Sequence, residues 1–288
     1  IRATNMESTG SAENIKRDAD NPKMKAKTLR AGVVQVYWSA RQGIAPLFKK
    51  KYTDMRLMFS AAVSMCGLFA TTNPKIQSPK DLIGKRVGVG EKGSAFLVET
   101  QFILKDCWGI WDKIKPEYLG FKPARDAFMD GLVDAVYSPG NLPGKGKYGI
   151  HPLMKSALQL KKGLHFVSLT KEQLNAGAKK RGWSISPMTL PAGGLKTNVP
   201  AKDTMVYNTQ LMFWAYADMP EDIAYEITKT VHDNIKTFNE AHAAMRIMSP
   251  EVMAWLPAAT EDEVHPGALK LYKEKGIKLS IGGDRPEL

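Results

Sequence analysis

The feature that most constrains the fold of this 288-residue chain is a glycine-rich junction, KRVGVGEKGSAF, at residues 85–96. Its three glycines, Gly88, Gly90 and Gly93, follow the spacing G-x-G-x-x-G between a short apolar run and an apolar helical pattern. Such a junction joins a strand to a helix and leaves the first N–H groups of the helix free to bind an anion. We therefore expect at least one β–α unit with an anion-binding site at the start of its helix.

Strand-like and helix-like segments alternate along the chain, which is typical of an α/β fold with a largely parallel sheet. Strands are expected over residues 1–7, 31–40, 116–121 and 164–169, and the apolar run 57–70 is expected to form one or two buried strands. Helices are expected from about Ser11, over 94–107, and from Asp218, which can cap a long helix. The Gly- and Pro-rich segment 139–149 is expected to be a loop.

One α/β unit is inserted into another. The segment 80–169 has its own strands and helices, while 1–79 and 170–288 lie on either side of it. We expect two lobes, of which lobe I (1–79 plus 170–288) is discontinuous and lobe II is formed by 80–169.

The same glycine spacing occurs in dinucleotide-binding folds, so an NAD(P)-dependent enzyme that uses residues 88–93 is the alternative function. That fold also needs an acidic residue about 20 positions further on, at the tip of the next strand. The strand expected over 116–121 ends in Phe121 and Lys122, without a carboxylate, although Lys122 would suit a 2′-phosphate. The sequence therefore favours another use of the junction.

Composition excludes several function classes. The net charge of +12 favours anionic partners, but the basic runs at 48–51 and 179–181 lack interleaved aromatics, so no nucleic-acid partner is expected. Cys66 and Cys107 form no C-x-x-C, and the five histidines lack metal-ligand spacing, so neither metal nor cofactor is expected. The uncharged run 57–74 is too short and too polar for a membrane span of ~20 residues. No catalytic constellation is present, so the chain is not expected to be an enzyme.

Three turns at the carboxyl ends of strands carry most of the residues that we expect to bind a ligand. At the junction, the Ser94 hydroxyl and the first N–H groups of the helix form an anion seat. A similar turn, STGS, lies at 8–11, and a third follows the strand DAVYS. Two further residues are expected on one face of the strand 31–40. The candidate ligand-binding residues are Ser8, Thr9, Gly10, Ser11, Gln35, Tyr37, Gly93, Ser94, Ala95, Phe96, Gly140 and Asn141.

Several blocks of the chain resemble the TAXI-type solute-binding proteins of TRAP transporters. The matching blocks are STGSAEN, GVVQ, SPKDLIGKRVGVGEKGS, KPEYLGFKPARDAFMDGLVDAVYSPGNLP, LPAGGL, ADMPEDIAYEITK and HPGALKLYKEKG. The resemblance covers residues 1 to about 278. It implies the type II periplasmic binding protein fold, with two α/β lobes, mostly parallel sheets with helices on both faces, and hinge strands between the lobes.

The resemblance also implies a function. Proteins of that family enclose a small organic anion, mostly a carboxylate such as a glutamate-like amino acid or a 2-oxoacid, and deliver it to TRAP membrane subunits. It implies a periplasmic location. The opening IRATN carries no signal peptide, so we expect a processed or truncated form. A sensor or scaffold that keeps the fold is a further alternative.

Two departures from the family pattern bear on the ligand. The family places Gly-Thr where this chain has Ala95 and Phe96, so one hydroxyl donor is lost and an aromatic face is gained. This indicates a carboxylate with a bulkier or less polar body than glutamate. An earlier strand and helix of the family pattern are also absent from this chain, and they form one wall of the pocket in the family.

Overall fold

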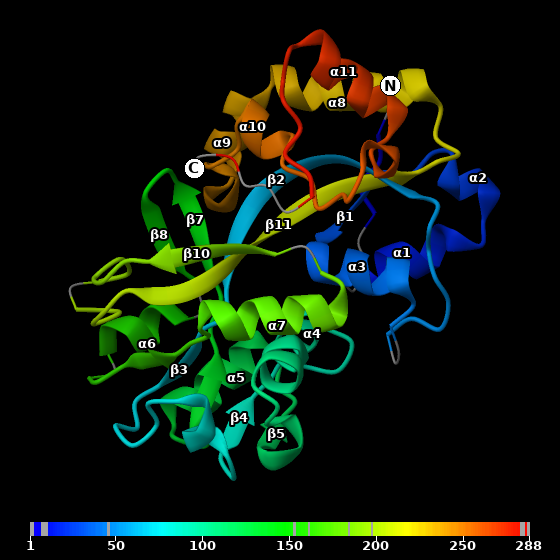
Figure 1. The fold of residues 1–288 in the computed structure, drawn as a ribbon. Coiled ribbons are helices and arrows are strands. Elements are labelled where there is room, and N and C mark those ends of the chain that lie inside the picture. Colours follow the sequence, from blue (N-terminus) through cyan, green and yellow to red (C-terminus); the bar gives the residue numbers. More distant parts are fainter. Residues whose placement is uncertain are drawn as a thin grey trace.

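The computed structural model describes residues 3–6, 11–44, 47–151, 154–160, 162–183, 185–196, 198–282 and 286. Two β-sheets flanked by helices form two lobes, with long strands running between them (Figure 1). The expected two-lobed α/β fold is therefore confirmed.

The first sheet has the strand order β1–β11–β2–β7–β8, with β10 also paired to β11. Its strands are β1 (Arg30–Val33), β2 (Met55–Cys66), β7 (Gly140–Gly144), β8 (Lys147–Ile150), β10 (Ser186–Leu190) and β11 (Thr204–Tyr216). The main helices of this lobe are α1 (Ser11–Ala19), α2 (Pro22–Lys25), α3 (Val34–Gln42), α8 (Glu221–Asp233), α9 (Ile235–Ala241), α10 (Pro250–Met253) and α11 (Pro266–Glu274). Helices α8 to α11 lie together on one side of the long strands, at the top of Figure 1.

The second sheet has the order β5–β4–β6–β3–β9. Its strands are β3 (Phe69–Thr71), β4 (Arg86–Gly88), β5 (Lys115–Glu117), β6 (Ala135–Tyr137) and β9 (His165–Val167). It is accompanied by α4 (Ala95–Gln101), which continues as a π-helical segment over Phe102–Cys107, and by α5 (Phe121–Met129), α6 (Lys155–Leu160) and α7 (Lys171–Arg181). Short 3₁₀-helical segments lie at Pro79–Leu82, Trp111–Lys113, Ala243–Met245 and Glu261–Glu263.

The sheets are mixed, and the expectation of mostly parallel sheets is wrong. Every pairing between described strands of the first sheet is antiparallel. In the second sheet β4 pairs in parallel with β5 and β6, whereas β3 pairs antiparallel with β6 and β9. The reason is that β2 and β11 run the length of the first sheet in opposite directions, which an alternation of helices and strands in the sequence does not reveal.

The boundaries expected for the lobes, with 80–169 as lobe II, stay a prediction. The strand pairings place β3, at 69–71, in the second sheet and the β7–β8 hairpin, at 140–150, in the first sheet. The chain thus passes between the sheets directly after β2, and again after β6, after β8 and after β9. Gly67, in the first of these connections, has φ 107°, a conformation that favours glycine.

Several expected elements are confirmed. The run 57–70 forms the two strands β2 and β3. Ser78 and Asp81 form a capping box, with the Asp81 carboxylate accepting from the Ser78 backbone N–H at 2.8 Å. Helix α1 begins at Ser11, and Ser94 caps the helix that follows the glycine-rich junction.

Other expectations are wrong in their boundaries. Residues 3–6 form no strand, and the strand expected over 31–40 ends at Val33, after which α3 begins. The segment 139–149 is a β-hairpin rather than a loop. The helix expected to be capped by Asp218 is instead preceded by Pro220 at its N-cap.

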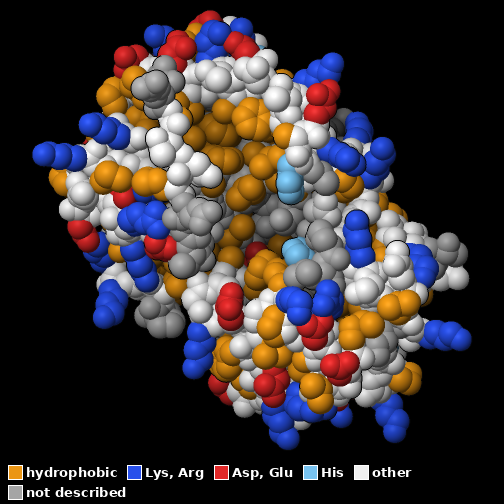
Figure 2. Space-filling view, turned by 180° about the vertical axis from the view of Figure 1, so that it is seen from behind, with side chains coloured by type: hydrophobic (Ala, Val, Ile, Leu, Met, Phe, Trp, Pro, Cys, Tyr) orange, Lys and Arg blue, Asp and Glu red, His pale blue; other side chains and the backbone are white. Residues whose placement is uncertain are grey.

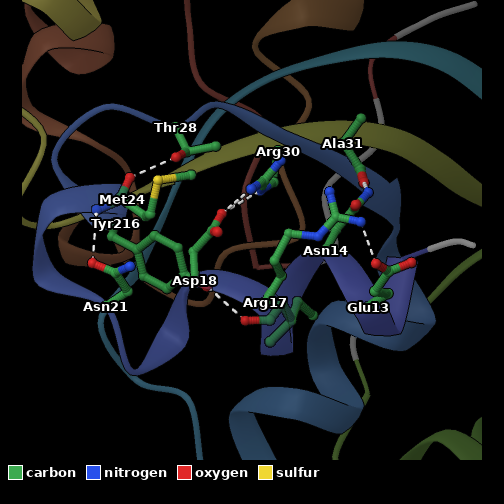
Figure 3. A network of polar contacts seen from close by, with 11 residues as sticks. Glu13, Asn14, Arg17, Asp18, Asn21, Met24, Thr28, Arg30, Ala31 and Tyr216 are labelled. Atoms are coloured by element: carbon green, nitrogen blue, oxygen red, sulfur yellow. Dashed lines mark hydrogen bonds and ion pairs between the residues drawn. The ribbon is translucent and has the colours of Figure 1, made fainter. Parts of the chain in front are cut away.

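A buried polar network fixes α1 to β1 and β11 (Figure 3). Arg30 donates to Asp18 through Nε at 2.6 Å, and the two side chains are 5% and 1% exposed. The Tyr216 hydroxyl donates to Ile15 O at 2.7 Å, and Asn14 Nδ2 donates to Ala31 O at 2.8 Å. This network holds α1 against the sheet of the first lobe.

No helix in the described part of the chain is long and apolar enough to cross a membrane. The described residues also hold no group of three or more His, Cys, Asp or Glu side chains suited to a metal ion. Cys66 and Cys107 are free thiols, as expected, but Cys107 is only partly buried.

Candidate ligand-binding cleft

A cavity of about 330 Å³ lies between α1 of the first lobe and the second lobe. Figure 2 shows one face of the molecule hollowed across its middle, with hydrophobic side chains in the hollow and Lys and Arg spread around it. The described residues that line the cavity are Ser11, Ala12, Gly88, Gly90, Glu91, Gly93, Ser94, Ala95, Phe96, Leu119, Gly120, Phe121, Ala124, Val136 and Tyr137.

The cavity receives the beginnings of three helices. Helix α1 contributes Ser11, α4 contributes Ala95, and α5 contributes Phe121. The first N–H groups of a helix have no partner within the helix, and the macrodipole places partial positive charge there. Three such ends therefore bring partial positive charge to the wall of one cavity, where the described lining residues include the Glu91 carboxylate and no Lys or Arg.

The shape of the glycine-rich junction depends on positive backbone φ angles. Gly90 has φ 90°, and a Cβ there would stand 2.8 Å from the Phe96 Cβ and 2.9 Å from the Leu97 nitrogen. Gly93 has φ 87°, with open space around it. The chain can therefore turn directly from β4 onto α4 only because Gly90 lacks a side chain.

The Ser94 hydroxyl is engaged in capping. It accepts from Leu97 N at 3.2 Å and donates to the Glu91 carbonyl oxygen at 2.7 Å. An anion at this helix start would therefore meet the backbone N–H groups of Ala95 and Phe96 first, and the hydroxyl serves to hold the turn.

Aromatic rings form one wall of the cavity. Phe96 and Phe121 meet edge to face with centroids 4.1 Å apart, and Phe121 stacks on His151 at 4.0 Å with an interplanar angle of 4°. Tyr137 lies 6.1 Å from Phe96 and is 4% exposed. Burial lowers the pKa of His151, so its ring is neutral at pH 7 and adds no positive charge to this wall.

A buried carboxyl lies behind this wall. Glu99, on α4, is 3% exposed, and the Tyr137 hydroxyl donates a hydrogen bond to its Oε2. Burial raises the pKa of Glu99 to about 7, while hydrogen bonds from Tyr137 and Cys66 oppose the rise. The carboxyl is therefore partly protonated at neutral pH.

The predicted binding residues divide into three groups. The cavity brings together Ser11, Gly93, Ser94, Ala95 and Phe96. The second group lies elsewhere: Gln35 and Tyr37 are fully buried in α3, and Gly140 and Asn141 belong to β7 and pair with β2. Ser8, Thr9 and Gly10 lie outside the described residues. All twelve assignments stay predictions.

Sequence reasoning missed the contribution of α5. The segment YLGF was read as the end of a strand, but β5 ends at Glu117 and Gly120 is the N-cap of α5. Pro123, in the first turn of that helix, was the available signal, because proline is tolerated there and marks helix starts. The earlier end of β5 also places a carboxylate, Glu117, at the tip of the strand, where none was expected.

A sequence profile of the NMT1-like family matches residues 1–276. Among solved structures, the periplasmic aliphatic sulphonate binding protein SsuA from Escherichia coli is 16% identical, with a TM-score of 0.40 over 82% of this chain and 61% of that one. The alkanesulfonate-binding protein SsuA from Xanthomonas axonopodis pv. citri is 16% identical, with a TM-score of 0.38 over 90% and 66%. A periplasmic transporter is 14% identical, with a TM-score of 0.47 over 94% and 85%. The chain thus spans less than two thirds of the length of either SsuA protein.

Proposed function

The chain belongs to the NMT1-like family, and from that premise we propose that it is a solute-binding protein of the periplasm. It encloses a small organic carboxylate between its two lobes and delivers it to the membrane subunits of a TRAP transporter. The ligand leaves chemically unchanged.

The observation that carries this proposal is the cavity onto which α1, α4 and α5 all begin. Helix starts are ready-made anion sites because free N–H groups and the macrodipole act together. Their origin in both lobes supports capture by closure, since an anion held by α4 would also attract the start of α1. The connections that pass between the two sheets, after β2, β6, β8 and β9, are the places where such a closure would bend.

The aromatic wall supports a ligand with an apolar body. Phe96 stands where the TAXI family places a hydroxyl, and its contact with Phe121 turns this side of the cavity hydrophobic. A ring or a branched aliphatic chain gains free energy by leaving water for such a surface, by ~25 cal/mol per Å² buried. The carboxylate end would meet the helix starts and the body would meet the rings.

Delivery to a TRAP permease rests on the sequence blocks that resemble the TAXI family, above all DLIGKRVGVGEKGS. The net charge of +12 raises the rate of anion capture through long-range attraction, which salt screens over about 10 Å at 0.1 M.

One observation favours a second candidate function, an NAD(P)-dependent enzyme. Glu117 stands at the carboxyl end of β5, beside the β4 strand that precedes the G-x-G-x-x-G turn, which is the position of the ribose-binding acid in dinucleotide folds. Glu117 is not among the described residues that line the cavity. Stabilisation by NAD or NADP, with no response to carboxylates, would establish this alternative.

The proposal is tested by differential scanning fluorimetry against a panel of carboxylates, NAD and NADP, because a ligand that binds the native state raises the melting temperature. The decisive variant is Ala95→Pro. Proline at the first helical position removes one N–H donor and keeps the helix, and Ser94 already has φ −78° and ψ 157°, which suits a residue before proline.

Loss of one hydrogen bond to a charged group costs about 1.5–3 kcal/mol, so Ala95→Pro should weaken the best carboxylate hit by roughly 10- to 150-fold. Lys171→Pro is the control, since it also places proline at the first position of a helix, α7, where Thr170 has φ −93° and ψ 164°; it removes one positive charge as well. Equal affinity of both variants and the wild type would contradict binding at α4.

A further inference from the structure

Glu91 is the one formally charged side chain among the described residues that line the cavity. It lies in the turn between β4 and α4, next to Gly90, and is exposed to solvent. The remaining described lining residues are glycine, alanine, serine, and aliphatic or aromatic side chains. A second negative charge on a ligand would therefore lie near Glu91, and none of these lining residues carries a positive charge to offset the repulsion.

The Glu91 carboxylate stands at the start of α5. A Cβ placed on Gly120 would lie 3.3 Å from Glu91 Oε2 and 3.8 Å from Oε1. Gly120 is the N-cap of α5 and provides no side-chain hydrogen bond to the helix. The chain thus places its own carboxylate where the nine-residue helix α5 attracts negative charge, and this position is not vacant for a ligand.

The aromatic wall formed by Phe96 and Phe121 offers nothing to a second carboxylate either. Phe96 and Phe121 face the same space with centroids 4.1 Å apart. A charged group packed against these rings would lose its hydrating water, which costs free energy. A ligand's first carboxylate can use the remaining helix starts, but a second one would lie beside either Glu91 or the rings.

We propose that Glu91 makes this cavity selective for monocarboxylates, because its own carboxylate occupies the start of α5 and repels a second negative charge. The proposal rests on the proposed function, since it names the class of carboxylate that the cleft accepts. Two unit charges about 4 Å apart repel by about 1 kcal/mol even in bulk water, which corresponds to a discrimination of about fivefold. Closure of the lobes around the ligand would exclude water and so increase this discrimination.

The test uses isothermal titration calorimetry with two matched pairs of probes that differ by one carboxylate. The aliphatic pair is hexanoate and adipate, and the aromatic pair is 3-phenylpropanoate and 3-(4-carboxyphenyl)propanoate. The wild type should bind the monocarboxylate of at least one pair at least about fivefold more tightly. Glu91→Gln should tighten the dicarboxylate by at least about fivefold and change the monocarboxylate less than about twofold.

Two controls separate charge from structure. Glu91→Asp keeps the charge and should keep the discrimination. Glu240→Gln removes the same unit charge at an exposed position of α9 and should leave both affinities as in the wild type.

The outcomes distinguish failure of the role given to Glu91 from failure of the proposed function. If a monocarboxylate binds but Glu91→Gln leaves the ratio of the two affinities unchanged, the role of Glu91 is refuted and the proposed function stands. If the wild type binds the dicarboxylate more tightly, selectivity for monocarboxylates is refuted. If neither class binds, the proposed function fails and this inference fails with it.

Discussion

The turn at Gly90 can be tested by a pair of substitutions that differ only in the space around the new methyl group. Gly90 and Gly93 have nearly the same positive φ, 90° and 87°. An alanine at either position therefore carries a similar backbone strain of about 1–2 kcal/mol. Only at position 90 would the Cβ meet other atoms, at 2.8 Å from the Phe96 Cβ and 2.9 Å from the Leu97 nitrogen.

The second contact is with backbone, so it cannot be relieved by a change of rotamer and must displace the start of α4. Overpacking of this kind costs about 1–3 kcal/mol. Gly90→Ala should therefore lower the free energy of unfolding by about 2–5 kcal/mol and Gly93→Ala by about 1–2 kcal/mol. Urea denaturation measures both. Because α4 would move, Gly90→Ala should also weaken carboxylate binding, whereas Gly93→Ala should do so much less. Equal destabilisation by the two variants would refute the close approach of α4 to Gly90.

Two further predictions concern buried polar groups. Asp18→Asn leaves Arg30 buried without its ionic partner and should lower the free energy of unfolding by about 3–5 kcal/mol in urea denaturation; a loss below 1 kcal/mol would show that water reaches the pair. Burial raises the pKa of Glu99 to about 7. The contribution of this carboxyl to the free energy of unfolding is therefore fully present below pH 4.5 and is lost as the pH rises through about 7. This amounts to about 3 kcal/mol, and melting curves between pH 4.5 and 8 should show the decline in the wild type and a flatter profile in Glu99→Gln.

The parts of the fold that sequence could predict are those fixed by local chemistry. The capping box of Ser78 and Asp81 and the cap at Ser94 each need only three or four neighbouring residues, and such short-range hydrogen bonds form wherever the backbone allows. The run 57–70 could be assigned to buried strands because it carries no charge and is mostly apolar. Strand pairing and orientation depend on residues far apart in sequence, and these were predicted less well.

Helix α3 shows why an apolar run is ambiguous. Residues 34–40 are all buried, so the polar face that would reveal a helical period is missing, and the β-branched residues favoured a strand. The strand β1 ends at Val33, where Ser11 Oγ accepts a hydrogen bond from its backbone N–H at 3.2 Å. Gln35 and Tyr37 were consequently assigned to a strand face, and the structure instead buries both within the first lobe.

The β7–β8 hairpin was missed for a different reason. Its glycines suggested a flexible loop, but they allow close approach of neighbouring chains. A Cβ on Gly140 would stand 2.5 Å from the Gly149 carbonyl oxygen and 2.5 Å from Met65 Cε. Glycine inside a strand often marks such an approach, and here it lets the hairpin pair closely with β2.

The location of the candidate site follows from the parallel strands of the second sheet. Strand β4 lies between β5 and β6, and all three point the same way, so their carboxyl ends meet at one edge of the sheet. The starts of α4 and α5 come together at that edge, although about 25 residues separate them in the sequence, and α1 of the other lobe reaches the same cavity. Each glycine-rich turn could be recognised locally, but their convergence could not. The proposed binding of an anion rests on this convergence rather than on the G-x-G-x-x-G spacing.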